Sequence, residues 1–180
     1  MIKRIFAVLT IIYMAIVSVL PFAFGGKIDD GAVKYKSEGN LYFFDSEAVA
    51  LSNASDVDAG LRAVALEANN LVNEERAQAG LDELVWDQNL ETVSHVRAKE
   101  CSQSFSHTRP SGKQWYTVNS KIQGGENLAF GFDTAEDAVE AWMNSPTHRD
   151  NILYDEFTKC AISIYETDDG TYYWAQEYGY

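Results

Sequence analysis

The chain is poor in cysteine, proline, histidine and basic residues. Its 180 residues include two Cys, three Pro and three His, and 14 Lys and Arg stand against 27 Asp and Glu. Two cysteines exclude a disulfide-dense scaffold. A net charge of −13 argues against nucleic acid as a partner, because phosphate backbones are bound by clustered cations. No internal repeat is visible, and the length suits one hydrophobic core.

The longest apolar stretch stands at the start of the chain. Lys3 and Arg4 precede the uncharged run 5–20, which Pro21 and small residues follow. This order is typical of a secretory signal peptide, so we expect residues 1–25 to be removed and the remainder to be secreted, with no stable membrane span. The alternative is an uncleaved anchor that keeps the protein at the cell surface, since residues 5–24 approach the roughly 20 needed to cross a bilayer.

The exported part carries all the acidic residues and both cysteines. Removal of residues 1–25 deletes Lys3 and Arg4 and no acidic residue, which moves the net charge from −13 to −15. Export makes a disulfide between Cys101 and Cys160 chemically possible. A reduced buried pair is equally compatible with the sequence, which does not supply the Cα separation. The pairing therefore stays open at this point.

Two helices are predicted after a segment without periodicity. Residues 26–59 mix Gly, Ser, Asp and Lys, and we expect a spacer, partly ordered at best, before a domain at 60–180. From residue 61 apolar residues recur at helical spacing until Gly80, which suits a left-handed stop. Asp87 is a good N-cap for a second helix that ends near Cys101.

The remaining elements are a third helix, a short helical turn and a hairpin. Thr134 and the acidic residues after it form a capping box. Ser145-Pro146 closes this helix and starts a short turn. Residues 160–165 and 172–178 alternate in polarity around an Asp-Gly turn, which predicts an antiparallel hairpin. Helices first and strands last indicate an α+β layered fold.

The three histidines differ in their surroundings. His95 has charged neighbours within the second helix, so we expect it at the surface or its boundary. His107 lies in a loop between Phe105 and Pro110, where binding groups concentrate. His148 falls in the turn after Ser145-Pro146.

Glu126 is the acidic residue that we group with the last two histidines. It follows two glycines that would let the backbone approach a cleft closely. Two imidazoles and a carboxylate suit a divalent cation such as Zn²⁺, and equally a His-Glu acid-base pair. The separations of 19 and 22 residues match no local metal motif, so only tertiary structure can bring His107, Glu126 and His148 into one polar cleft.

Two serines near these histidines also invite a hydrolase hypothesis. Neither Ser106 nor Ser145 stands in a Gly-x-Ser-x-Gly nucleophile elbow. A loop hydroxyl and a helix cap are sufficient roles for them. The serines therefore give the hydrolase hypothesis little weight.

Three segments resemble the ordered motifs of the CAP superfamily, which groups cysteine-rich secretory proteins, antigen 5 and plant pathogenesis-related proteins. They are residues 105–110 (FSHTRP), 125–129 (GENLA) and 141–153 (AWMNSPTHRDNIL). The likeness runs from about residue 71 to residue 176 and includes LVNEER at 71–76 and YWAQ at 173–176. The chain is similar to the bacterial branch of this superfamily.

The resemblance implies a three-layer α-β-α sandwich, with a small antiparallel sheet between helices and a central cleft that holds two His and two acidic residues. His107, His148 and Glu126 match three of these positions. In animal and plant relatives a Glu follows, by a few residues, the Trp that corresponds to Trp142. In this chain Asn144 or Ser145 stands at that position. A full tetrad is therefore not expected.

This departure favours a binding module over an enzyme. We expect it to bind a lipid, a cell-envelope component or a protein partner, with no certain cofactor and at most a weakly held divalent cation on His107, Glu126 and His148. The alternative is a metal-assisted or His-dependent hydrolase in which the same three residues are the catalytic candidates.

Overall fold

The structure is a computed structural model that describes residues 26–29, 31–36, 42–52 and 57–180. The predicted signal peptide, residues 1–25, lies outside this part of the chain. Within it, no helix combines the length and the apolar character needed to cross a membrane.

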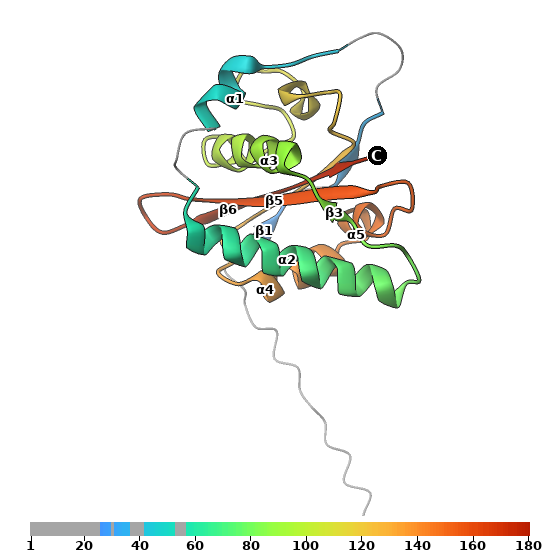
Figure 1. The fold of residues 1–180 in the computed structure, drawn as a ribbon. Coiled ribbons are helices and arrows are strands. Elements are labelled where there is room, and N and C mark those ends of the chain that lie inside the picture. Colours follow the sequence, from blue (N-terminus) through green and yellow to red (C-terminus); the bar gives the residue numbers. More distant parts are fainter. Residues whose placement is uncertain (1–25, 30, 37–41, 53–56) are drawn as a thin grey trace, which may run out of the picture.

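A six-stranded sheet forms the middle layer (Figure 1). Its strands are β1 (Lys27–Ile28), β2 (Val33–Lys34), β3 (Val85–Trp86), β4 (Gly125–Phe130), β5 (Lys159–Glu166) and β6 (Tyr172–Gly179). The order is β1-β4-β6-β5-β3, and β2 also pairs with β4. Only the β3–β5 pairing is parallel among the described strands. β6, the last strand in the sequence, therefore lies between β4 and β5.

Helices cover both faces of the sheet. They are α1 (Ser46–Ser52), α2 (Ala59–Gln78), α3 (Gln88–Cys101), α4 (Ala135–Asn144) and α5 (Pro146–Ile152), with a 3₁₀ turn at Trp115–Val118. α1 and α3 lie on one face, and α2 and α4 lie on the other (Figure 1). The predicted three-layer α-β-α sandwich is confirmed.

The predicted helix ends are confirmed by their caps. The Asp87 carboxylate accepts from the N–H groups of Asn89 and Leu90 at the start of α3. Thr134 Oγ1 accepts from the Asp137 N–H at the start of α4, 3.2 Å away. Gly80 follows α2 with a φ of 76°, the left-handed conformation that glycine adopts at low cost.

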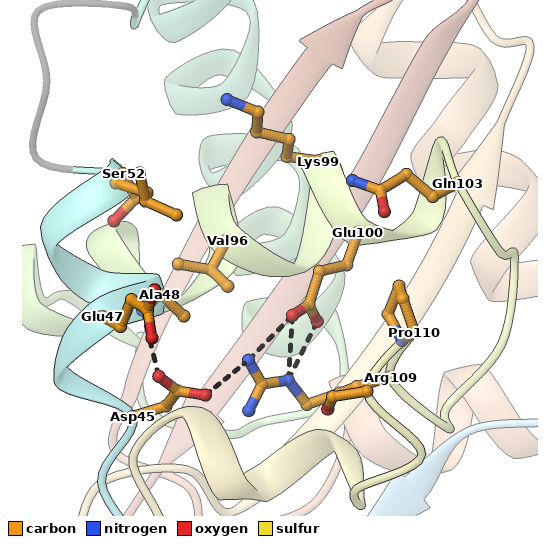
Figure 2. A pocket seen from close by; sticks show the side chains of 12 residues that line it. Asp45, Glu47, Ala48, Ser52, Val96, Lys99, Glu100, Gln103, Arg109 and Pro110 are labelled. Carbon is orange, nitrogen blue, oxygen red and sulfur yellow. Dashed lines mark hydrogen bonds and ion pairs between the residues drawn. The ribbon is translucent and has the colours of Figure 1, made fainter.

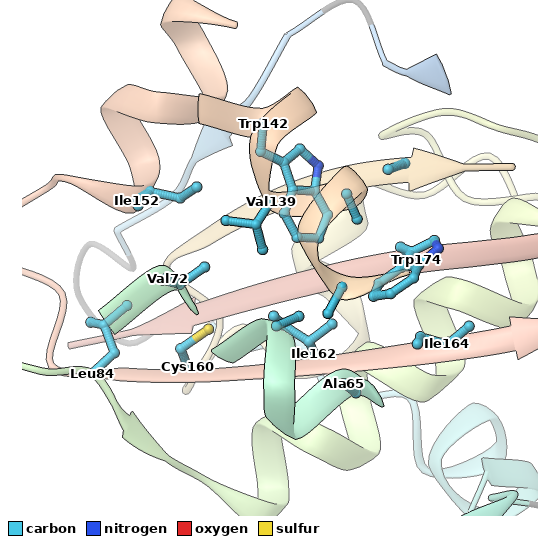
Figure 3. Packing of buried hydrophobic residues seen from close by; sticks show 14 of the residues in the cluster. Ala65, Val72, Leu84, Val139, Trp142, Ile152, Cys160, Ile162, Ile164 and Trp174 are labelled. Atoms are coloured by element: carbon cyan, nitrogen blue, oxygen red, sulfur yellow. The ribbon is translucent and has the colours of Figure 1, made fainter. Parts of the chain in front are cut away.

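The main core lies between the sheet and the layer of α2 and α4 (Figure 3). Trp142 and Trp174 meet edge to face, with ring centroids 6.4 Å apart. Each indole N–H is satisfied, because Trp142 donates to the Leu128 carbonyl and Trp174 to the Phe132 carbonyl. Burying both rings therefore leaves no indole donor unpaired.

The two cysteines are free and buried. Cys160 lies in the main core, whereas Cys101, on α3, packs in a smaller cluster with Leu128 and Ala175. The two thiols belong to different layers of the sandwich, so the sheet separates them.

The region that we expected to be a spacer contains β1, β2 and α1. β1 pairs with Phe130 and Ala129, and β2 pairs with Glu126 and Gly125. These two short strands continue the sheet beyond β4, at the edge where the predicted site residues lie.

Candidate functional site

The three predicted site residues come from different elements. His107 lies in the loop after α3, Glu126 on β4 and His148 on α5. His107 Nδ1 lies 2.7 Å from Glu126 Oε1. His148 is joined to this pair through a fourth residue, Asp29, whose two carboxylate oxygens contact Nε2 of His107 and Nε2 of His148.

Arg97 fixes Glu126 from the α3 side. Its Nε donates to Glu126 Oε2 at 2.6 Å, and one terminal nitrogen donates to the Ser106 carbonyl at 2.7 Å. Both Arg97 and Glu126 are completely buried. The arginine therefore ties the carboxylate to the backbone of the loop that carries His107.

The charges of Arg97, Glu126, His107 and Asp29 stabilise one another. Burial by itself raises the pKa of Glu126, but the charge of Arg97 and the hydrogen bonds from His107 and Arg97 outweigh it and lower the pKa to about 2. Burial lowers the pKa of His107, but its hydrogen bonds with Asp29 and Glu126 raise it to about 10. His107 is therefore an imidazolium held between two carboxylates.

Arg97 also extends this network away from Glu126. Glu100 Oε2 lies 2.6 Å from Arg97, and Glu100 Oε1 lies 2.8 Å from Arg109. Arg109 in turn lies 3.3 Å from Asp45. Figure 2 shows Arg109 between Glu100 and Asp45, in the wall of a pocket between α1 and α3. Charges of alternating sign thus brace both ends of the His107 loop.

His148 is oriented by two partners. Its Nδ1 lies 2.7 Å from the Ser145 hydroxyl, and its Nε2 contacts Asp29. Ser145 stands at the N-cap position of α5 but its side chain makes no capping hydrogen bond. Its hydroxyl is therefore committed to His148.

Buried amides hold β4 and α5 together beside Glu126 and His148. Asn127 Nδ2 donates to the His148 carbonyl at 3.2 Å and to Gln176 Oε1 at 3.0 Å. Asn151 Nδ2 donates to the Glu126 carbonyl and to Asn127 Oδ1, at 3.2 and 3.0 Å. These bonds fix the position of His148 relative to Glu126.

A second buried carboxyl lies across the strand pair from Glu126. Glu177 is the register partner of Glu126 on β6 and is fully buried. Gln123 Nε2 donates to its Oε2 at 3.0 Å. Burial first, and then the negative charge of Glu126, raise the pKa of Glu177 well above its usual range. Of the two carboxyls, Glu126 is the ionised one and Glu177 the protonated one.

The glycines before Glu126 have a different role from the predicted one. A Cβ on Gly124 would stand 2.8 Å from Tyr180 Cε2, and one on Gly125 would stand 2.7 Å from Phe157 Cζ. These glycines therefore make room for aromatic rings of the core and C-terminus.

Sequence reasoning missed three members of the site. Asp29 stands in a segment without periodicity, and its contact with His148 spans 119 residues. Neither Arg97 on α3 nor Glu177 on β6 was predicted as a site residue. The signal that could have found them is a charged residue at a core position, since such residues are rarely buried without partners. His95, expected at the surface or its boundary, is only 4% exposed.

The donor set was compared with the needs of a divalent cation. Both Glu126 oxygens accept from Arg97 or His107, and both His107 nitrogens have protein partners. Among the described residues, no group of three or more His, Cys, Asp or Glu side chains is arranged to hold a metal ion. As arranged, these residues do not fit a cation, and we derive no chemistry through one.

Comparison with known proteins finds a family whose sequence profile matches this chain. The profile of the cysteine-rich secretory protein family, CAP, matches residues 70–178. The uncharacterised protein YkwD of Bacillus subtilis is 30% identical over 115 residues, which are 60% of this chain and 44% of that protein. The uncharacterised membrane protein YlbC of the same species is 28% identical over 53% of this chain and 30% of its own. The chain spans less than half the length of either relative.

Two solved structures share the fold. An extracellular protein of Bacillus anthracis with an SCP domain is 25% identical, with a TM-score of 0.59 over 65% of this chain and 40% of that one. An outer surface protein of Borrelia burgdorferi is 23% identical, with a TM-score of 0.55 over 62% of this chain and 87% of that one. The second likeness concerns the fold alone.

Proposed function

Because the chain belongs to the CAP family of cysteine-rich secretory proteins, we propose that it is a secreted binding module whose cleft, formed by His107, Glu126 and His148, captures a lipid, a cell-envelope component or a protein partner. The extracellular location of the similar SCP-domain protein of Bacillus anthracis supports the location. Removal of residues 1–25 as a signal peptide is part of this proposal.

One observation carries the proposal. The imidazoles of His107 and His148 point their Nε2 atoms at the same carboxylate, from two different layers of the fold. His148 is completely buried, and each ring has a second partner, the buried Glu126 for His107 and the Ser145 hydroxyl for His148. Two fixed imidazoles that converge on one anionic group form a preorganised recognition site, which lowers the cost of binding.

The test is capture by isolated bacterial cell envelopes. We expect the wild-type chain to sediment with them, and His107→Ala and His148→Ala each to lower the bound fraction about tenfold, the equivalent of one charge-assisted contact. Asp168→Ala, in the exposed β5–β6 turn, is the matched control and keeps wild-type capture. Circular dichroism verifies that each variant is folded. Normal capture by both folded histidine variants would exclude the cleft.

A second candidate function is hydrolysis, favoured by one arrangement. The Ser145 hydroxyl lies 2.7 Å from His148, whose other ring nitrogen contacts Asp29. A hydroxyl, an imidazole and a carboxylate in this order can activate a nucleophile. A hydrolase would release nitrophenol from a p-nitrophenyl ester, and Ser145→Ala would reduce turnover by about a thousandfold or more while envelope capture persists. Equal turnover in the folded variant rules this candidate out.

The weak divalent cation on His107, Glu126 and His148 stays a prediction. Binding would require His107 to lose a proton, because imidazoles that ligate a metal are neutral. The Asp29 carboxylate would also have to move, because it contacts Nε2 of both histidines. The binding proposal does not depend on it.

A further inference from the structure

The N-terminal segment, residues 26–29 and 31–36, occupies the open edge of β4. β1 pairs with Phe130 and Ala129, and β2 pairs with Glu126 and Gly125. Between these pairings the segment has four residues where β4 has two. The pairing is therefore interrupted by a bulge, and bulges redirect a side chain.

The redirected side chain is Asp29. Its carboxylate lies between the imidazoles of His107 and His148, and the side chain is 3% exposed. His107 Nε2 also contacts the Gly31 carbonyl of the same segment. Asp29 therefore holds the place that an anionic group of a bound ligand would take.

Contacts C-terminal to the bulge define the rest of the docked segment. The Thr147 hydroxyl accepts from the Ala32 N–H at 3.3 Å, and Asn151 Nδ2 donates to the Val33 carbonyl at 3.2 Å. The Tyr35 ring stacks on Tyr116, with centroids 3.6 Å apart. These contacts recognise an extended backbone and one aromatic side chain.

The lysines of the segment complement the acidic body. Lys34 Nζ lies 4.7 Å from the centre of the Tyr154 ring. Lys36 Nζ lies 2.8 Å from Glu156 and 4.9 Å from the centre of the Tyr180 ring. The whole chain has 27 acidic and 14 basic residues. Its net negative charge therefore favours the binding of a basic strand.

The segment is not needed for the pairing of the longer strands of the sheet. Both of its strands pair with β4 alone, and β4 keeps its six-residue pairing with β6. Ile28 is partly buried and packs against the main core. The remaining contacts described above are polar, aromatic or backbone contacts at the edge. This is the pattern of a peptide that adds a strand to a sheet.

We propose that the cleft is a receptor for an extended peptide that carries an aspartate before a basic, aromatic stretch, and that the N-terminal segment is a tethered copy of this ligand. The tethered copy exchanges with a peptide of the same chemistry from a partner protein. This inference rests on the proposed function and specifies its ligand class.

The probe is a fluorescein-labelled peptide with the sequence of residues 26–36, GKIDDGAVKYK, added to the full chain. Fluorescence anisotropy compares wild type with Asp29→Ala/Tyr35→Ala, in which the tethered copy is weakened. A tether competes at an effective concentration near the millimolar range, so we expect the double variant to bind the peptide at least about tenfold more tightly. Asp168→Ala, the control, binds like wild type.

Two further measurements complete the test. A probe peptide with Asn in place of Asp29 should bind the double variant about tenfold more weakly, because it cannot pair with the imidazoles as an anion. Adding His107→Ala to the double variant should lower its affinity for the unmodified peptide by the same factor of about ten. A cooperative thermal transition verifies that the triple variant is folded. If the folded double variant does not bind the peptide, or binds it no better than wild type, the inference is wrong. The envelope assay judges the binding proposal separately.

Discussion

At the scale of single residues, the site depends on two buried carboxyls that face each other in different protonation states. Arg97 and His107 surround Glu126 with positive charge, whereas Glu177 has the neutral Gln123 amide as its hydrogen-bond donor. A second negative charge next to Glu126 would be costly in this buried place. Protonation of Glu177 therefore favours the folded site.

Glu177→Gln tests this arrangement through pH. The folded-state pKa of Glu177 is raised, so the wild-type chain loses stability as pH rises above the unfolded pKa of about 4.3 and toward the folded pKa. An amide cannot ionise. Relative to wild type, we therefore expect the variant to gain free energy of unfolding as pH rises above about 4.3, the unfolded pKa of a glutamate. Urea unfolding at several pH values measures this gain.

Glu166→Gln provides the matched control, because Glu166 is exposed at the end of β5. Its pH dependence should parallel that of wild type. If the free energy of unfolding of Glu177→Gln also changed with pH in parallel with that of wild type, Glu177 would be ionised in the folded chain.

Single residues also show how far the sequence predicts the site. Residue type singled out His107, Glu126 and His148, and the structure joins all three through direct contacts or through Asp29. Asp29 could not be found, because no local pattern records a contact across 119 residues. The position of Asp29 depends on the pairing of β1 and β2 with β4, which forms only in the folded sheet.

At the scale of elements, periodicity and caps predicted α2, α3, α4 and α5 but missed α1 and β4. Its sequence, GENLAF, includes Glu126 and Asn127, which are buried by polar partners. Five of the six residues of β4 are buried, polar and apolar ones alike. The strand therefore does not show the alternation of polar and apolar residues by which a half-buried strand is predicted. The β5–β6 hairpin was predicted correctly, because its two strands alternate in polarity on either side of an Asp-Gly turn.

Thr134→Ala tests the start of α4, the helix that carries Trp142. Loss of the hydrogen bond from the Asp137 N–H to Thr134 Oγ1 should lower the free energy of unfolding by about 1 kcal/mol. Thr134→Ser keeps the hydroxyl and should recover most of that loss. Denaturant titration compares the three proteins. If Ser and Ala destabilise equally, the threonine methyl group, and not the cap, is the source of stability.

At the scale of the whole molecule, the sandwich keeps its two thiols apart and out of water. Burial raises the pKa of both Cys101 and Cys160 to about 12. Because the thiolate is the reactive form, we expect Ellman's reagent to leave the native chain unmodified and to titrate both thiols once urea unfolds it.

A reducing agent provides the control for this experiment. Dithiothreitol should not change the midpoint of denaturation, because there is no bond for it to reduce. If the unfolded, unreduced chain titrated no thiols, the cysteines would be joined after all.

The position of β6 in the middle of the sheet also governs when the fold can form. β4 and β5 have no pairing with each other, and both join the sheet through the last strand of the sequence. During synthesis from the N-terminus, the sheet therefore stays incomplete until residues 172–179 are free to fold. A premature stop before β6 would remove the strand that joins the two halves of the sheet.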